Sequence, residues 1–416
     1  MLTTVNDILW GKLLITMLTI LGIKLLFQSR FFIFRQANEI IKLTFKEDKK
    51  AFSTLCAALG GTIGVGNTVG VAAAISIGGA GSVFWMLVAA FLAMTIKFFE
   101  TYLSCLCKDS ALGFGGPMHY INAFIKSKFL AKTFAFSLPF CALFVGNLCQ
   151  SDMFCQASEN FCGLREEYFA LLLCIFVVLA ITRNKTVKLL TAVVPFMSVI
   201  YILLCAVILF MQAEKIPSAV SMIFSEAFNF KAALGGFGGA GISCAISQGF
   251  SKGMFSNEAG MGSSPLAHSQ SPNPCPKTQG CWGVIEVFID TVVICLISAL
   301  VILSSPFSDI QSCFGYRLGM AGEGFFCLCM GLFAFASMCS WWMYADCAIR
   351  YLSPSKAYQK LYKLLFVAVI PLGCYLPTQT CLALGDLLNA VTATVNVSAI
   401  TVISSNRHVK KLLNEL

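Results

Sequence analysis

The chain has 416 residues, of which 57% are apolar and only 12% are charged. Because soluble domains carry about 25% charged residues, this composition excludes an ordinary water-soluble domain and indicates the lipid bilayer as solvent. The net charge of +9 does not indicate a nucleic-acid partner, since basic residues of a membrane protein gather in the loops that set its orientation.

Eleven apolar segments are long enough, or nearly long enough, to span a bilayer as helices. They predict an all-α membrane protein with about eleven transmembrane helices. The segments are expected at residues 10–28, 51–77, 81–107, 133–156, 168–182, 189–212, 232–262, 280–304, 323–349, 361–377 and 380–404.

Residues 1–50 are expected to form a first helix followed by a surface segment. The stretch 29–50 is the most charged of the chain and contains FFIFRQANEIIKLTF. This run fits an amphipathic helix lying on the inner membrane surface. An ordinary solvated loop is the alternative.

Two of the expected spans are interrupted by glycine. The second contains LGGTIGVGNTVGVAAA, with five glycines around Asn67 and Thr68. The seventh has seven glycines between Gly235 and Gly253 and ends in Ser-Asn-Glu. Each interior glycine weakens a helix by about 1 kcal/mol relative to alanine. Close helix packing explains small residues at such spacing, but it does not explain the polar pair beside them, so both helices are predicted to be broken.

The two broken helices each begin a block of five segments, 51–212 and 232–405, which a connecting loop at 213–231 joins. Since five is odd, the second block starts on the opposite side of the membrane, which is the layout of an inverted repeat. Broken helices at matching positions of such repeats mark the substrate site: half-helix ends meet a carboxylate, and unwound carbonyls suit sodium.

The loops carry an uneven charge. If the N-terminus lies outside, the inner loops and the tail at 406–416 hold 22 lysines and arginines, and the outer side holds five. This asymmetry predicts an outer N-terminus and a cytoplasmic C-terminus. The twenty cysteines mostly lie singly in apolar runs, where free cysteine packs as a small hydrophobe, so no disulfide framework is expected.

Three blocks of sequence resemble one known family. They are GTIGVGNTVGVAAAISIGGAGSVFWM with AMTIKFFE and GFGGPMHY, then SKGMFSNEAGMGSSPLAH with QGCWGVIEVFIDT, and FAFASMCSWWMYAD. Over about residues 50–350 the chain resembles the alanine/glycine:cation symporter family, of the sodium:alanine symporter type. The resemblance implies a leucine-transporter-like fold, a five-plus-five inverted repeat with one extra N-terminal helix.

The resemblance also implies a substrate site and a sodium site. Trp341 is implied to limit the size of the substrate pocket, although an interfacial aromatic anchor is the alternative. The implied substrate-binding residues are Val65, Gly66, Asn67, Thr68, Gln150, Phe255, Ser256, Asn257 and Trp341. The implied sodium ligands are the backbone oxygens of Gly60 and Ile63 and the hydroxyl of Ser337. The chain departs from the family pattern at Asp152, Ser247 and Lys252.

Other polar residues fall within or near the spans. Glu258 and Asp290 are carboxylates at membrane depth, where ionisable groups are costly and are candidates for function. Lys97 and Glu100, three apart on one helix, are expected to pair. His268 falls in an expected loop.

The predicted function is sodium-coupled symport of a small neutral amino acid, namely alanine, glycine or serine, by alternating access across a bacterial-type cytoplasmic (inner) membrane. A proton-coupled or altered-specificity amino-acid transporter of the same fold is the alternative. No GxSxG, HExxH or P-loop motif indicates an enzyme. Apart from the amino acid, the coupling sodium ion and the lipid bilayer, no obligatory partner is evident.

Overall fold

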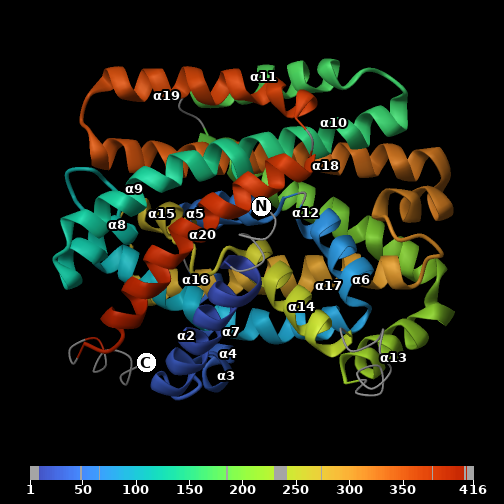
Figure 1. Cartoon of the computed structure of the whole chain (residues 1–416), viewed down its shortest axis with the longest axis horizontal. Helices are drawn as coiled ribbons and strands as arrows, with labels where there is room; N and C mark the ends of the chain where they lie inside the picture. Colours follow the sequence, from blue (N-terminus) through green and yellow to red (C-terminus); the bar gives the residue numbers. More distant parts are fainter. Residues whose placement is uncertain are drawn as a thin grey trace.

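The computed structural model describes residues 9–46, 49–64, 66–183, 186–228, 241–272, 274–376, 378–406 and 409. In this described part the helices are joined by turns and short irregular stretches, and there are no strands (Figure 1). Its elements, in which η marks π- or 3-10-helical turns, are η1 (Leu9–Leu14), α2 (Ile15–Gln28), α3 (Phe32–Arg35), α4 (Ala37–Lys46), α5 (Lys49–Thr62), η2 (Gly66–Gly70), α6 (Val71–Gly78), α7 (Gly81–Leu106), α8 (Pro117–Tyr120), η3 (Ile121–Ile125), α9 (Lys128–Leu143), η4 (Phe144–Leu148), α10 (Cys149–Cys162), α11 (Glu166–Thr182), α12 (Thr186–Met211), η5 (Ala213–Lys215), α13 (Ile216–Ala227), α14 (Gly241–Asn257), α15 (Pro265–Ser269), α16 (Pro276–Val287), η7 (Phe288–Cys295), α17 (Leu296–Leu303), α18 (Ile310–Leu352), α19 (Lys356–Val369), η8 (Ile370–Tyr375) and α20 (Thr378–Ile403).

Each of the eleven predicted segments coincides with helix in these residues. Six of the helices are long and apolar enough to cross a bilayer, and a bent pair makes a seventh if it counts as one span. Shorter helices, α2, α11, α14 and α19, occupy the remaining four segments. The six are Gly81–Leu106, Lys128–Cys162, Thr186–Met211, Pro276–Leu303, Ile310–Leu352 and Ala383–Ile403.

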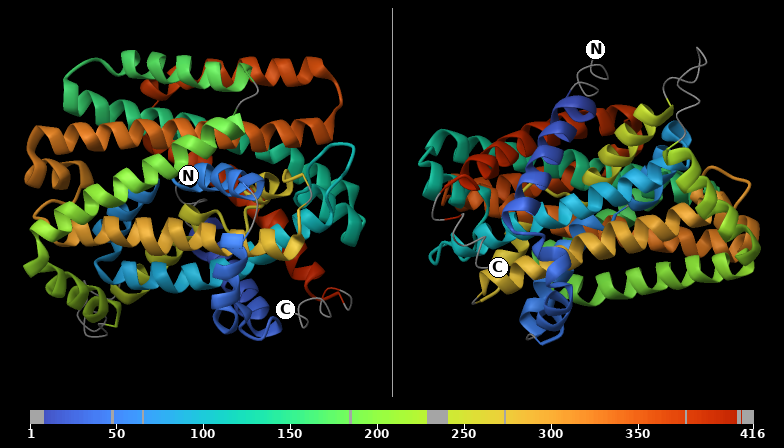
Figure 2. Two further views of the ribbon diagram at one scale, coloured as in Figure 1. Left: turned by 180° about the vertical axis from the view of Figure 1, so that it is seen from behind. Right: turned by 90° about the horizontal axis from the view of Figure 1, so that it is seen from below.

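The long helices run side by side in layers. Figure 1 shows α11 and α19 along one edge of the molecule, next to α10 and α18, and the contacts between these four helices agree. Figure 2 shows α12 crossing the bundle obliquely, where it packs against α18, α17 and α5. In Figure 1 α8 lies near one end of the bundle and α13 near the other, as expected for loops on opposite sides of a membrane.

The predicted break in the second segment is present. Helix α5 ends at Thr62, and α6 continues at an angle of 54° to it. The Ile63 amide still donates to the Leu59 carbonyl over 2.7 Å. In contrast, the Gly64 amide donates to Asn67 Oδ1 over 2.9 Å. A side chain therefore replaces the helical acceptor at the point where the helix stops.

In the seventh segment the helix ends within the Ser-Asn-Glu stretch that closes the glycine run. Residues 229–240, which hold the first glycines of that run, lie outside the described residues. Helix α14 extends to Asn257, after which Glu258, Gly260 and Gly262 have φ of +53°, +80° and +74°. These left-handed residues turn the chain into α15. The glycines inside α14 serve packing, since a Cβ on Gly249 would lie 2.4 Å from the Ser82 carbonyl oxygen on α7.

The stretch 29–50 contains the short helices α3 and α4, which favours the helical alternative over a loop. Helix α4 packs against α16. Lys277, near the start of α16, forms an ion pair with Glu39 at 3.4 Å.

Candidate functional site

A small cavity lies between the two breaks. Its volume is about 30 Å³. Two glycines of the first break, two aromatic rings and several polar side chains form its wall. The lining residues are Gly61, Thr62, Gly64, Gly66, Val145, Gln150, Phe255, Ser256, Glu258, Met261, Trp341 and Asn389. Five residues implied to bind substrate thus meet here, namely Gly66, Gln150, Phe255, Ser256 and Trp341.

Two further implied substrate residues lie behind this wall. Asn67 is fully buried, and its Nδ2 donates to Asp290 Oδ1 over 2.6 Å. The Thr68 hydroxyl lies 3.5 Å from the sulfur of Met330 on α18. Val65 falls outside the described residues. Asn67 therefore holds the shape of the break by joining it to η7, rather than lining the cavity.

Asp290 joins the two broken helices. Its Oδ1 accepts from Asn67 of the first break, and its Oδ2 accepts from the Ser256 hydroxyl of α14 over 2.9 Å. The hydroxyl of Thr291 also donates to Oδ2, over 2.9 Å. Asn257 lies beside this cluster, with Nδ2 donating to the Gly253 carbonyl at 2.7 Å and to Thr291 Oγ1 at 3.2 Å. The sequence marked Asp290 as a costly carboxylate but gave no sign of its partners.

Gln150 and Trp341 form the opposite wall. The Gln150 carboxamide donates to the Val145 carbonyl at 3.3 Å, and its Oε1 would lie 3.1 Å from a Cβ on Gly64. Trp341 is only 1% exposed and packs on Gly146, where an added Cβ would lie 2.2 Å from the indole Cγ. A ring buried so completely is not an interfacial anchor, so the structure favours the pocket-wall alternative.

Two buried hydroxyls of α18 include the one implied to bind sodium. The Ser337 hydroxyl on α18 is fully buried, and within the described residues it has no hydrogen-bond partner. The hydroxyl of Ser340, one turn later, is also buried and has no hydrogen-bond partner within the described residues. Its Oγ would lie 2.6 Å from a Cβ on Gly60. The last carbonyls of a helix such as α5 lack helical partners, and Gly60 is in its last turn. Hydroxyl and carbonyl oxygens without a titrating group are suitable ligands for a sodium ion. The sodium site implied at Gly60, Ile63 and Ser337 stays a prediction.

A buried cluster of charges lies next to the second break. Lys97 Nζ donates to Ser264 Oγ at 2.8 Å and lies 3.4 Å from Glu100 Oε1 and 3.6 Å from Glu286 Oε1. The expected Lys97–Glu100 pair is confirmed, but it is one part of a larger network. His268 lies within α15, not in an open loop, and its Nε2 is 3.0 Å from Glu286 Oε2.

The same network ties the turn after α14 to the last long helix. Asn396 of α20 donates to Glu100 Oε2 at 3.1 Å and to the Gly260 carbonyl at 2.9 Å. The Tyr120 hydroxyl donates to the carboxamide oxygen of Asn396. The Ser263 hydroxyl donates to Glu258, whose side chain lines the cavity. These hydrogen bonds thus hold the turn after α14 in place beside the cavity.

The three positions that depart from the family pattern do not line the cavity. Asp152 is buried and accepts from Gln156 Nε2 at 2.7 Å. Lys252 Nζ lies 5.9 Å from the ring centre of Phe255. Ser247 is half-buried on α14.

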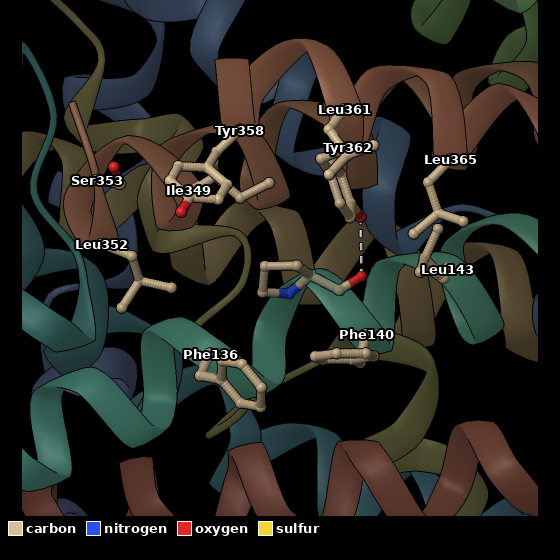
Figure 3. A pocket seen from close by; sticks show the side chains of 11 residues that line it. Phe136, Phe140, Leu143, Ile349, Leu352, Ser353, Tyr358, Leu361, Tyr362 and Leu365 are labelled. Carbon is tan, nitrogen blue, oxygen red and sulfur yellow. Dashed lines mark hydrogen bonds between the residues drawn. The ribbon is translucent and has the colours of Figure 1, made fainter. Parts of the chain in front are cut away.

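A nearly wholly apolar hollow lies in a different place. It has a volume of about 500 Å³, and it lies between α9, the end of α18 and α19 (Figure 3). Figure 3 shows Phe136 and Phe140 facing Leu361 and Leu365, with the Tyr362 hydroxyl donating to the Pro139 carbonyl over 2.8 Å. It shares no residue with the cavity at the breaks. Its wall offers hardly any polar atom to a charged solute, so it is not the candidate substrate site.

Comparisons with known proteins identify a family. The model of the sodium:alanine symporter family matches residues 1–415. A transporter of Haemophilus influenzae is 34% identical over 367 residues, covering 85% of this chain and 76% of the relative. A probable sodium/glutamine symporter of Bacillus subtilis is 31% identical and covers 96% and 87%. A sodium/alanine symporter of Methanococcus maripaludis is 32% identical and covers 97% and 94%.

Proposed function

The chain belongs to the sodium:alanine symporter family, and we propose that it imports alanine, glycine or serine together with sodium by alternating access. Membership indicates cation-coupled transport of an amino acid by a multi-pass membrane protein, and not an enzyme. The observation that carries the finer proposal is the cavity enclosed by both helix breaks.

The wall of the cavity suits a small zwitterion. Helix η2–α6 begins at Gly66, so the positive end of its dipole lies at the cavity and favours a carboxylate there. Helix α14 ends at Asn257, where free carbonyls suit an ammonium group or sodium. The Phe255 and Trp341 rings in the wall would restrict the substrate's side chain to a small group.

Uptake by the purified chain in proteoliposomes tests the proposal. An inward sodium gradient should drive accumulation of labelled alanine, glycine or serine, and leucine or phenylalanine should compete poorly. Glutamine belongs in the panel, because one relative is named a sodium/glutamine symporter. Uptake that ignores sodium and follows a proton gradient would favour the proton-coupled alternative, with the buried carboxylate of Asp152 as the first residue to examine.

Ser337→Ala tests the ion site. Removing the unpaired hydroxyl should raise the sodium concentration for half-maximal uptake several-fold while leaving substrate affinity in saturating sodium nearly unchanged. Ser158→Ala is a matched control, since that buried hydroxyl already donates to the Phe154 carbonyl at 2.8 Å. Equal sodium dependence of the two variants would remove Ser337 from the ion site.

Trp341→Ala tests the limit on substrate size. Loss of the ring should enlarge the cavity, and binding of valine or leucine relative to alanine should rise about tenfold or more, since one extra methylene is worth about 1–3 kcal/mol once it fits. Competition assays would measure the change. Trp342→Ala is the control, because that neighbouring ring stacks on Tyr362 instead. An unchanged preference order in Trp341→Ala would contradict the assignment.

The same proposal includes the eleven spans, the inverted repeat of residues 51–212 and 232–405, and the outer N-terminus. Matching contacts support the repeat: α9, third in its block, packs on α20, and α18, third in the other block, packs on α12.

A cysteine at Val220 of α13, in a chain stripped of native cysteines, should react with an impermeant maleimide added outside. Reaction only from inside would reverse the orientation.

A further inference from the structure

Asn389 is a buried amide that the fold does not use. It lies on α20, is fully buried, and lines the cavity at the breaks. Within the described residues neither its Oδ1 nor its Nδ2 has a hydrogen-bond partner. Most buried polar side chains in proteins are paired, and each exception calls for an explanation. A polar residue within the apolar run LLNAVTATV was the only signal in the sequence.

The neighbouring contacts place this amide at the cavity. Gly385, one turn earlier on α20, packs so closely on Val145 that a Cβ there would lie 2.7 Å from Val145 Cγ2. Val145 itself lines the cavity and accepts from Gln150. Thr392, nearly one turn later, is satisfied by Ser137 Oγ at 2.9 Å and the Leu388 carbonyl at 3.0 Å. The unpaired amide is therefore the part of this helix that faces the cavity.

We propose that Asn389 hydrogen-bonds the side-chain hydroxyl of the transported amino acid, and so sets the preference for serine over alanine. This inference rests on the proposed function. The charged ends of the substrate are assigned to the two broken helices, and α20 is neither of them. Asn389 is therefore placed with Gln150 and Trp341 on the wall that would meet the side chain. Of these three, Asn389 is the one whose donor and acceptor atoms both lack a partner within the described residues. A carboxamide has one acceptor and two donor hydrogens, and a hydroxyl both donates and accepts.

Asn389→Leu separates this role from a structural one. Leucine has a similar volume and no polar atom, so the variant should be at least as resistant to heat as the parent, because no internal hydrogen bond is lost. Binding of serine relative to alanine should fall about tenfold, the usual scale for one lost hydrogen bond. Thr392→Val, on the same helix, should leave the serine-to-alanine ratio unchanged.

Competition of serine and alanine for labelled alanine uptake measures the ratio, and thermal unfolding of the purified full chain measures stability. An unchanged ratio in Asn389→Leu would overturn the inference even if alanine transport is normal. A large loss of heat resistance would overturn it too, since Asn389 would then serve the fold. Failure of the parent chain to transport either amino acid would instead refute the proposed function.

Discussion

Replacing Lys97 by methionine should lower the free energy of unfolding by about 3–5 kcal/mol, the usual result of removing one partner from a buried ion pair. Lys97, Glu100 and Glu286 are all fully buried. Methionine fills much of the space but leaves two carboxylates facing each other without a cation. Thermal unfolding of the detergent-purified protein, followed by fluorescence-detected gel filtration, measures the loss.

A second substitution sharpens this test. Glu286→Gln added to Lys97→Met removes one of the stranded charges, so the double variant should recover part of the stability. Arg165→Met is the control for an ion pair at the surface. Arg165 and Glu167 are 2.7 Å apart, and their side chains are 75% and 33% exposed. That variant should unfold like the parent. A Lys97→Met protein as stable as the parent would mean that the buried lysine and its two glutamates are not all ionised in the parent.

The Lys97 cluster shows which contacts can be predicted from the spacing of residues along one helix and which cannot. Lys97 and Glu100 could be paired from sequence, because three residues on a helix bring side chains to one face. The contacts of Lys97 with Glu286, and of Glu100 with Asn396, join residues 189 and 296 positions apart. No periodicity carries such information, since it depends on how whole helices pack.

The broken helices show a similar limit. Glycines beside polar residues predicted the first break at residues 60–70, and the helix does stop there, after Thr62. In the seventh segment the described glycines of α14 bring it close to α7, and the turn comes at Glu258 to Gly262. Composition cannot tell a glycine that allows close packing from one that needs a positive φ, so the different roles of Gly249 and Gly260 could not be predicted.

Asp290→Ala should reduce uptake about a hundredfold or more while the protein still folds. The Asn67 amide and the Ser256 hydroxyl would each lose their acceptor. An orphaned buried donor costs about 1–3 kcal/mol, and about 1.4 kcal/mol corresponds to a tenfold change in rate. The two breaks would no longer be held in register across the cavity, so Asp290 acts as a positioning residue. Initial rates of alanine uptake, normalised to folded protein, measure the effect.

Further variants at and beside Asp290 distinguish a role in positioning the two breaks from a role in protein stability alone. Asp290→Asn keeps an acceptor for Asn67 and a polar group for Ser256, with weaker hydrogen bonds than a carboxylate makes, so its uptake should fall between that of the parent and that of Asp290→Ala. Thr291→Val removes a donor to the same carboxylate and the weaker of the two acceptors of Asn257, which keeps the Gly253 carbonyl. Because the bonds of Asn67 and Ser256 to Asp290 remain, its uptake should drop only a few-fold. If all three variants lose uptake in proportion to their loss of heat resistance, Asp290 serves the fold alone. A loss of uptake in Asp290→Ala that exceeds the loss of stability, with Thr291→Val nearly normal, would mean that the link between the two breaks is what transport requires.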